Sequence, residues 1–163
     1  MQPNDESPTA DEIWFHSWRG VLFASARVLR ISDRDMLEHH GFPLTWFDVL
    51  SRLVDAAPVG LRMQELEELA LFSRSGLTRL VDRIEAAGLV RRQPVPGDRR
   101  GVRVLLTNDG RERYDAAIVR HREVIEREFG QKLTAAQHRA VADALWPWWH
   151  DGDSPNAPDA GPG

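Results

Sequence analysis

Arginine and small hydroxyl side chains gather between Ser73 and Arg103. This segment carries eight arginines against Asp82, Glu85 and Asp98, a local net charge of +5, although the whole chain of 163 residues has a formal net charge of −4. Arginine donates paired hydrogen bonds to guanine edges and to phosphates, and hydroxyl groups bind either. The segment therefore predicts a nucleic-acid-binding surface on an otherwise acidic body.

The first half of the segment has the periodicity of an amphipathic helix with Ser73 as its N-cap. Its core-facing positions follow helical spacing: Leu77, Leu80, Val81 and Ile84. On the opposite face, beside Asp82, the candidates for base edges in a major groove are Ser75, Thr78 and Arg79. The candidates for phosphate contacts are Ser73, Arg74 and Arg83. Gly76 costs this helix about 1 kcal/mol relative to alanine, and serves either close approach to a phosphate or packing.

The second half predicts a β-hairpin with strands at 89–94 and 102–106. Val102, Val104 and Leu106 alternate with Arg103 and Leu105, and Pro94, Pro96 and Gly97 fit a turn and an edge strand. Near its tip, Arg100 is the candidate for a minor groove, where a narrow A·T tract concentrates negative potential. Arg99 is the alternative, and the sequence leaves open which of the two points inward. Asp98 is compatible with a simple turn-forming role.

A long helix precedes this unit. Thr9 and Glu12 fit a capping box, Gly41 fits a C-cap, and Ser32-Asp33 is an alternative break. One stripe of this helix contains Trp14, Trp18, Leu22, Ser25 and Leu29. About 30 helical residues span about 45 Å, which one small core cannot cover. We therefore expect part of the stripe to meet a partner.

Further elements are expected on both sides of the helix and hairpin. A helix starts at Thr45 with Phe47, Leu50, Leu53 and Val54 inward, and a turn at 56–60, a short strand at 61–62 and a helix at 64–71 follow. Thr107 caps a helix to about residue 130, and Thr134 caps a sixth that Pro147 kinks or ends.

Other candidate sites are weaker. Five residues either line an effector pocket or belong to the core and a dimer interface: Trp14, Trp18, His39, Trp46 and Phe47. The six histidines lack metal-ligand spacing, so no metal is expected, and solvated or hydrogen-bonded histidines are the default. No catalytic motif is present, and neither an enzyme nor a cofactor is expected.

Composition excludes several classes. The chain has no cysteine, which rules out disulfides, thiolate metal sites and thiol-based redox sensing. No apolar run approaches the roughly 18 residues of a membrane span, and the N-terminus lacks a signal-peptide pattern. We expect a cytoplasmic protein without a membrane partner.

Taken in order, these passages resemble the MarR family of bacterial transcription regulators over residues 14–148. The first is the helix–turn–helix core at 66–90, ending Glu85-Ala86-Ala87-Gly88-Leu89-Val90. The second is the wing Asp98-Arg99-Arg100, followed by Val102, Val104 and Leu106-Thr107. The third is the helix pair after Thr107, with Gly110 in a Leu-Thr-x-x-Gly start.

The resemblance implies a mainly α (α+β) fold with a winged helix–turn–helix at 45–107 and homodimerisation through helices at 9–44 and 108–149. The polar ends at 1–8 and 150–163 are expected to be disordered. It implies binding to a palindromic operator in double-stranded DNA. Such regulators usually repress transcription, and many release the DNA when a small, often aromatic ligand binds. It also implies that Asp98 orients Arg100.

Two other functions remain open at this point. A winged-helix scaffold dimer would need neither Arg79 nor Arg100 for its role. A small-molecule carrier or an enzyme built on the dimer would need turnover, or ligand binding that leaves DNA affinity unchanged.

Overall fold

The computed structural model describes residues 12–69, 74–95 and 97–150, and the ends and Ser73 lie outside it. Within these residues the elements follow the predicted order, with a 3₁₀ turn, η1 (Gly130–Lys132), before the last helix. The Thr9 cap and most of the tail predicted to be disordered also lie outside the described residues. None of the helices in the described part is long and apolar enough to cross a bilayer.

The first helix, α1 (Ile13–His40), is continuous and ends at Gly41, whose φ of 74° is the left-handed conformation that favours glycine. The alternative break at Ser32-Asp33 is therefore wrong. Asp33 does not compete with its own helix, because its carboxylate accepts a hydrogen bond from the backbone N–H of Leu44 at 2.9 Å. Asp33 thus satisfies the first backbone N–H of α2 (Leu44–Asp55), whose N-cap residue is Pro43.

The main core lies among α2, α3 (Met63–Leu69), α4 (Arg74–Ala86) and the sheet. The predicted inner face of α4 is confirmed, with its four apolar residues at most 3% exposed. A second cluster, formed by Met36, Phe42, Phe47 and Ala117, joins α1 and α2 to α5 (Asn108–Glu128). The two clusters share Trp46 and Tyr114 at their edges, which links the two ends of the molecule.

The sheet has three antiparallel strands in the order β1 (Leu61–Arg62), β3 (Asp98–Leu106), β2 (Val90–Val95). β3 begins at Asp98 rather than at the predicted Val102, because Val95 pairs with Asp98 across an irregular register. Such a short, polar start carries no alternating pattern for sequence analysis to detect.

Helices α5 and α6 (Ala135–His150) complete the fold. Thr107 caps α5 by accepting from the N–H of Gly110 at 3.0 Å, as predicted. Thr134 and Gln137 form a reciprocal capping box ahead of α6. Pro147 does not end α6, which continues to His150.

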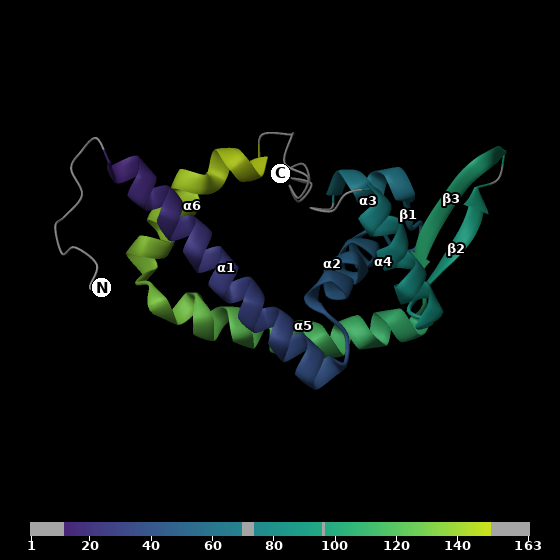
Figure 1. Ribbon diagram of the computed structural model, residues 1–163, viewed down its shortest axis with the longest axis horizontal. Helices are drawn as coiled ribbons and strands as arrows, with labels where there is room; N and C mark the ends of the chain where they lie inside the picture. The colour runs from purple at the N-terminus through teal and green to yellow at the C-terminus, as the bar shows by residue number, and fades with distance from the viewer. Residues whose placement is uncertain (1–11, 70–73, 96, 151–163) are drawn as a thin grey trace.

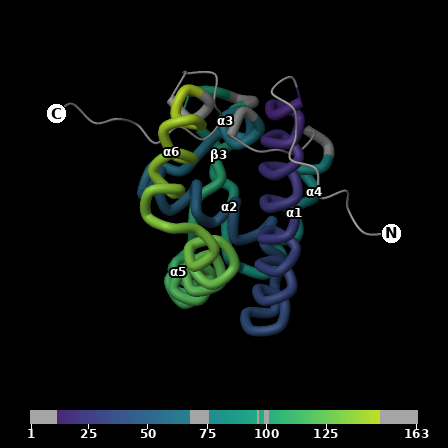
Figure 2. The backbone as a smooth tube through the Cα atoms, turned by 90° about the vertical axis from the view of Figure 1, so that its left-hand side faces the viewer, coloured from purple at the N-terminus to yellow at the C-terminus, as the bar shows by residue number. Residues whose placement is uncertain are grey.

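The molecule has two ends joined by α5 (Figure 1). The β2–β3 hairpin projects beyond α2, α3 and α4 at one end. At the other end, α1 and α6 lie on opposite sides (Figure 2). The hairpin therefore lies at the opposite end of the molecule from α6 and the start of α1.

Candidate functional site

The outer face of α4 is open to solvent. Thr78, Arg79, Asp82 and Arg83 are all exposed, opposite the buried apolar residues of the helix. The side chains of Arg74 and Ser75 lie outside the described part of the structure, although both residues belong to α4. The structure therefore presents Thr78 and Arg79 as donors and acceptors on one face of a 13-residue helix.

The hairpin lies beside this face, with α4 contacting β2. Arg99 and Arg100 are the second and third residues of β3, but their side chains are not among those described. Which of them enters a groove stays a prediction. Helix α4 and the projecting hairpin lie at the same end of the molecule (Figure 1), as a two-part reading unit requires.

Asp98 makes a contact that sequence reasoning missed. Its carboxylate Oδ2 lies 2.9 Å from Nη1 of Arg62, which comes from β1 on the far side of β3. A Cβ on Gly101 would stand 2.5 Å from that carboxylate oxygen, so glycine leaves the space that this side chain needs. No sequence signal links residues this far apart, because the contact depends on the pairing of β1 with β3.

Arg92 and Arg103 of the basic segment bind acceptors outside their own strands. Arg103 donates to the carbonyl of Gly60 at 2.8 Å. Arg92 bonds Asp82 and Glu85 of α4. The charge of the segment is therefore partly neutralised internally, and less of it faces a ligand than the count of arginines suggests.

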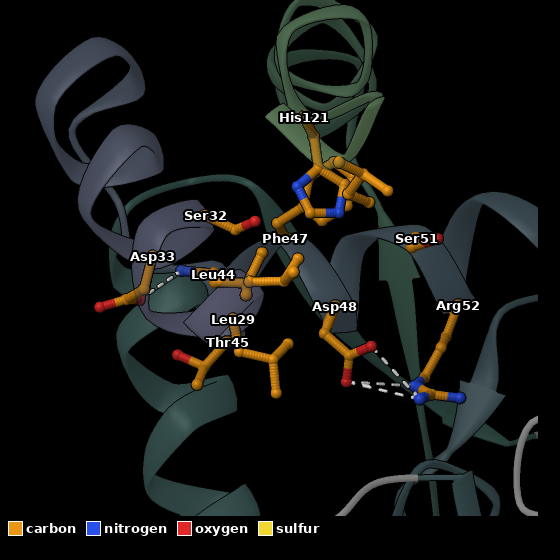
Figure 3. A pocket seen from close by; sticks show the side chains of 12 residues that line it. Leu29, Ser32, Asp33, Leu44, Thr45, Phe47, Asp48, Ser51, Arg52 and His121 are labelled. Atoms are coloured by element: carbon orange, nitrogen blue, oxygen red, sulfur yellow. Dashed lines mark hydrogen bonds and ion pairs between the residues drawn. The ribbon is translucent and has the colours of Figure 1, made fainter. Parts of the chain in front are cut away.

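A pocket of about 630 Å³ opens between α1, α2 and α5. Its walls are mainly apolar, and a few polar groups converge on it (Figure 3). The lining residues are Val28, Leu29, Ser32, Asp33, Leu44, Thr45, Phe47, Asp48, Ser51, Arg52, His121 and Ile125. Small-molecule sites commonly combine apolar walls with a few polar groups in this way.

Two polar atoms in the pocket wall have no hydrogen-bond partner within the described structure. They are Oγ of Ser32, which is 1% exposed, and Nδ1 of His121. The His121 ring lies 4.7 Å from the Phe47 ring, and burial lowers the pKa of His121, which favours the neutral imidazole. Buried polar atoms without partners are uncommon, and both could bond a molecule in the pocket.

The predicted pocket residues do not come together in this pocket. Phe47 lines it, whereas Trp46 stacks on Phe42 and His39 lies beside Asp35. Trp14 and Trp18 are exposed near the start of α1.

Several lining residues were not predicted. The Asp48–Arg52 ion pair, at 3.2 Å, has the i, i+4 spacing that sequence can reveal. Ser32 and His121 come from α1 and α5, and only the tertiary packing of those helices places them together.

An ion pair next to the pocket ties α1 to α5. Nε and Nη2 of Arg120 donate to the two carboxylate oxygens of Asp35, at 2.7 and 2.9 Å. These hydrogen bonds lower the pKa of Asp35 despite its burial. Within the described residues, no group of three or more His, Asp or Glu side chains could hold a metal ion.

Comparison with known proteins places this geometry in a family. The profile of the MarR family matches residues 40–101, from the end of α1 to the wing. The chain is 35% identical over 107 residues to the transcriptional regulator PecS of Dickeya dadantii, covering 63% of this chain and 64% of PecS. It thus spans less than two thirds of that relative's length.

Solved structures extend the match along the chain. Sco3205, a MarR family transcriptional regulator from Streptomyces coelicolor solved in complex with DNA, is 30% identical with a TM-score of 0.75, covering 88% of this chain and 89% of that one. AbsC, from the same organism, is 27% identical with a TM-score of 0.75, covering 87% and 94%. By its sequence, its helix–turn–helix and its wing, this chain belongs to the MarR family of transcriptional regulators.

Proposed function

We propose that the protein is a homodimeric repressor that binds a palindromic DNA operator and is released by a small ligand. The observation that carries this proposal is the exposed Thr78–Arg79 face of α4 beside the projecting hairpin. A helix of this kind fits a major groove, and an arginine-bearing hairpin fits the neighbouring minor groove.

Within this proposal the contacts divide by type. Arg79 donates two hydrogen bonds to a guanine, and Ser75 and Thr78 contact neighbouring base edges. The phosphate contacts fall to Ser73, Arg74 and Arg83 at the two ends of α4. Arg100, or Arg99 in its place, enters the minor groove, with Asp98 helping to orient it.

Exposed apolar side chains on α1 and α6 support the homodimer. On α1 they include Trp14, Trp18, Leu22 and Phe23, and on α6 they include Val141, Leu145 and Trp146, all at least 36% exposed. An exposed apolar patch of this extent marks an interaction surface. A second copy of the chain would cover it, and its two-fold axis would match an operator with two related half-sites.

The pocket between α1, α2 and α5 supports control by a ligand. Its lining joins the long helices to α2, which packs directly on the reading unit. A neutral molecule with an aromatic or apolar body and a hydrogen-bonding group would fit the wall around Phe47, Ser32 and His121. Such a ligand would change DNA affinity only by binding one arrangement of the two ends more tightly than the other.

Selection from a random duplex library tests the proposal. The full chain is expected to enrich a two-fold symmetric sequence with half-sites about 34–36 Å apart or a multiple of that. Footprinting on an enriched duplex should protect both half-sites. A library that returns no common sequence after several rounds would refute the operator and favour a scaffold role.

A further inference from the structure

Arg92 occupies an unusual place in the reading unit. It belongs to β2, where it pairs with Val104 of β3, yet its guanidinium reaches across to α4. One nitrogen, Nη2, lies 2.7 Å from Oδ1 of Asp82, and Nη1 bonds Oε2 of Glu85. Its backbone N–H also donates to the other oxygen of Glu85 at 2.7 Å. Three contacts thus join one residue of the wing to two carboxylates of the helix.

The carboxylates of Asp82 and Glu85 lie on the helix that is proposed to enter the major groove. Asp82 is 56% exposed and lies on the same outer face of α4 as Thr78 and Arg79. Uncompensated, the charges of Asp82 and Glu85 would repel phosphates along the groove that α4 enters. The Arg92 side chain is only 26% exposed, so its charge is directed at the carboxylates rather than at solvent.

Arg91, the residue before Arg92 in β2, has a different hydrogen-bond partner. Arg91 is exposed, and its guanidinium hydrogen-bonds Gln93 on the same strand. Successive residues of a strand point to opposite faces, so the two arginines carry equal charge in opposite directions. Arg91 is therefore a matched control for Arg92.

We propose that Arg92 is a positioning residue that fixes the hairpin to α4 and neutralises Asp82 and Glu85, so that helix and wing meet DNA together. This rests on the proposed DNA-binding function. The planar guanidinium spans both carboxylates, which a lysine ammonium cannot do in the same geometry. Arg92 itself contacts no DNA.

The first test measures the hairpin without DNA. The chain has no cysteine, so spin labels can be placed on Ala86→Cys in α4 and Val102→Cys in the hairpin, with labelled protein diluted into unlabelled protein. The interspin distance distribution is expected to be narrow with Arg92 present and clearly broader or shifted in Arg92→Ala. An unchanged distribution would overturn the proposal whether or not the protein proves to bind an operator.

The second test is a mutant cycle on the enriched duplex, read by fluorescence anisotropy. Arg92→Ala is expected to raise Kd by about tenfold, and Arg91→Ala by clearly less. In the Asp82→Asn/Glu85→Gln background, the further change Arg92→Ala should cost no more than about threefold. Arg92→Lys should recover only part of the loss.

Two results of the cycle would overturn the proposal. One is a loss of affinity on Arg92→Ala that persists in full without the two carboxylates. The other is a fall of about one per subunit in the slope of log Kd against log salt, because that fall would mark a direct phosphate contact. Circular dichroism on each variant checks that the fold is intact before the binding data are compared. Failure of the wild-type protein to bind any duplex selectively would count against the proposed function, and the spin-label result would then decide the role of Arg92.

Discussion

At the scale of single residues, the Asp35–Arg120 ion pair predicts that the stability of the fold depends on pH in the acid range. Hydrogen bonds from Arg120 hold the pKa of Asp35 below its usual value. The pair therefore stabilises the folded state above the unfolded pKa of about 3.9, and this stabilisation is lost as pH falls through the lower folded pKa. We expect Asp35→Asn to unfold at lower urea concentration than wild type near neutral pH, and the two proteins to converge in strong acid.

Urea midpoints by circular dichroism at a series of pH values check this prediction. A gap between wild type and variant that stays constant into strong acid would show that the carboxylate charge is not what stabilises the fold.

His121 predicts a pH dependence in a different range. Burial lowers its pKa in the folded protein, so the unfolded chain takes up a proton first as pH falls below about 6.5. The free energy of unfolding should therefore decrease below that pH, by about 1.4 kcal/mol for each unit of difference between the two pKa values. We expect His121→Gln to reduce this decrease, as measured by urea unfolding between pH 7 and pH 5.

His16→Gln removes an exposed histidine from α1 and serves as the control. Its unfolding curve should follow wild type through the same pH range. If His121→Gln also followed wild type, the neutral buried imidazole would not be the source of the effect.

At the scale of the elements, Gly110 near the start of α5 packs closely against Leu89, the residue before β2. A Cβ on Gly110 would stand 2.0 Å from the carbonyl oxygen of Leu89 and 2.9 Å from its carbon. Backbone cannot move away as a flexible side chain can, so we expect Gly110→Ala to destabilise the fold by about 1–3 kcal/mol despite its better helix propensity. Urea unfolding measures this loss.

Gly20→Ala in α1 is the matched control, because nothing lies within 4 Å of its added Cβ. It should leave stability unchanged or raise it by up to about 1 kcal/mol. Equal destabilisation by both substitutions would remove the steric explanation for Gly110.

How far an element could be predicted depended on its pattern. The inner face of α4 could be predicted from its 3.6-residue periodicity. The capping residue Gly41 correctly predicted the end of α1, and Thr107 and Thr134 predicted the starts of α5 and α6. The early start of β3 at Asp98 could not be predicted, since a charged, glycine-containing stretch has no strand alternation. The long first helix was predicted, but the alternative break at Ser32-Asp33 could not be dismissed from sequence, because the hydrogen bond from Leu44 to Asp33 exists only after folding.

One part of the candidate site could be predicted from sequence and the other could not. The outer face of α4 lies within one helix, so residue spacing alone brought Thr78 and Arg79 together. The pocket draws on three helices, and the aromatic residues of the sequence gave no information on which of them would meet. Arg62 and Arg92 were hidden for the same reason, since strand pairing and helix contact decide their partners.

At the scale of the whole molecule, the proposed dimer predicts that a charge placed in its interface will separate the two subunits. Trp18 is 55% exposed on α1, and a charge in an apolar interface carries a large desolvation cost. We expect wild type to sediment as a dimer at micromolar concentration and Trp18→Glu to sediment as a monomer. Val59→Glu, which charges a residue 62% exposed in the turn before β1, should remain dimeric. A wild-type monomer, or a dimer unaffected by Trp18→Glu, would contradict this interface.

The central claim is that α4 and the hairpin read DNA sequence. Its most direct test is fluorescence anisotropy of the wild-type protein and Arg79→Ala on the enriched duplex and on a scrambled duplex, at two salt concentrations. The account predicts tight, selective wild-type binding that weakens steeply with salt, and a loss of about 1–3 kcal/mol of discrimination in Arg79→Ala. Equal, weak binding of wild type to both duplexes, or unchanged selectivity without Arg79, would contradict it.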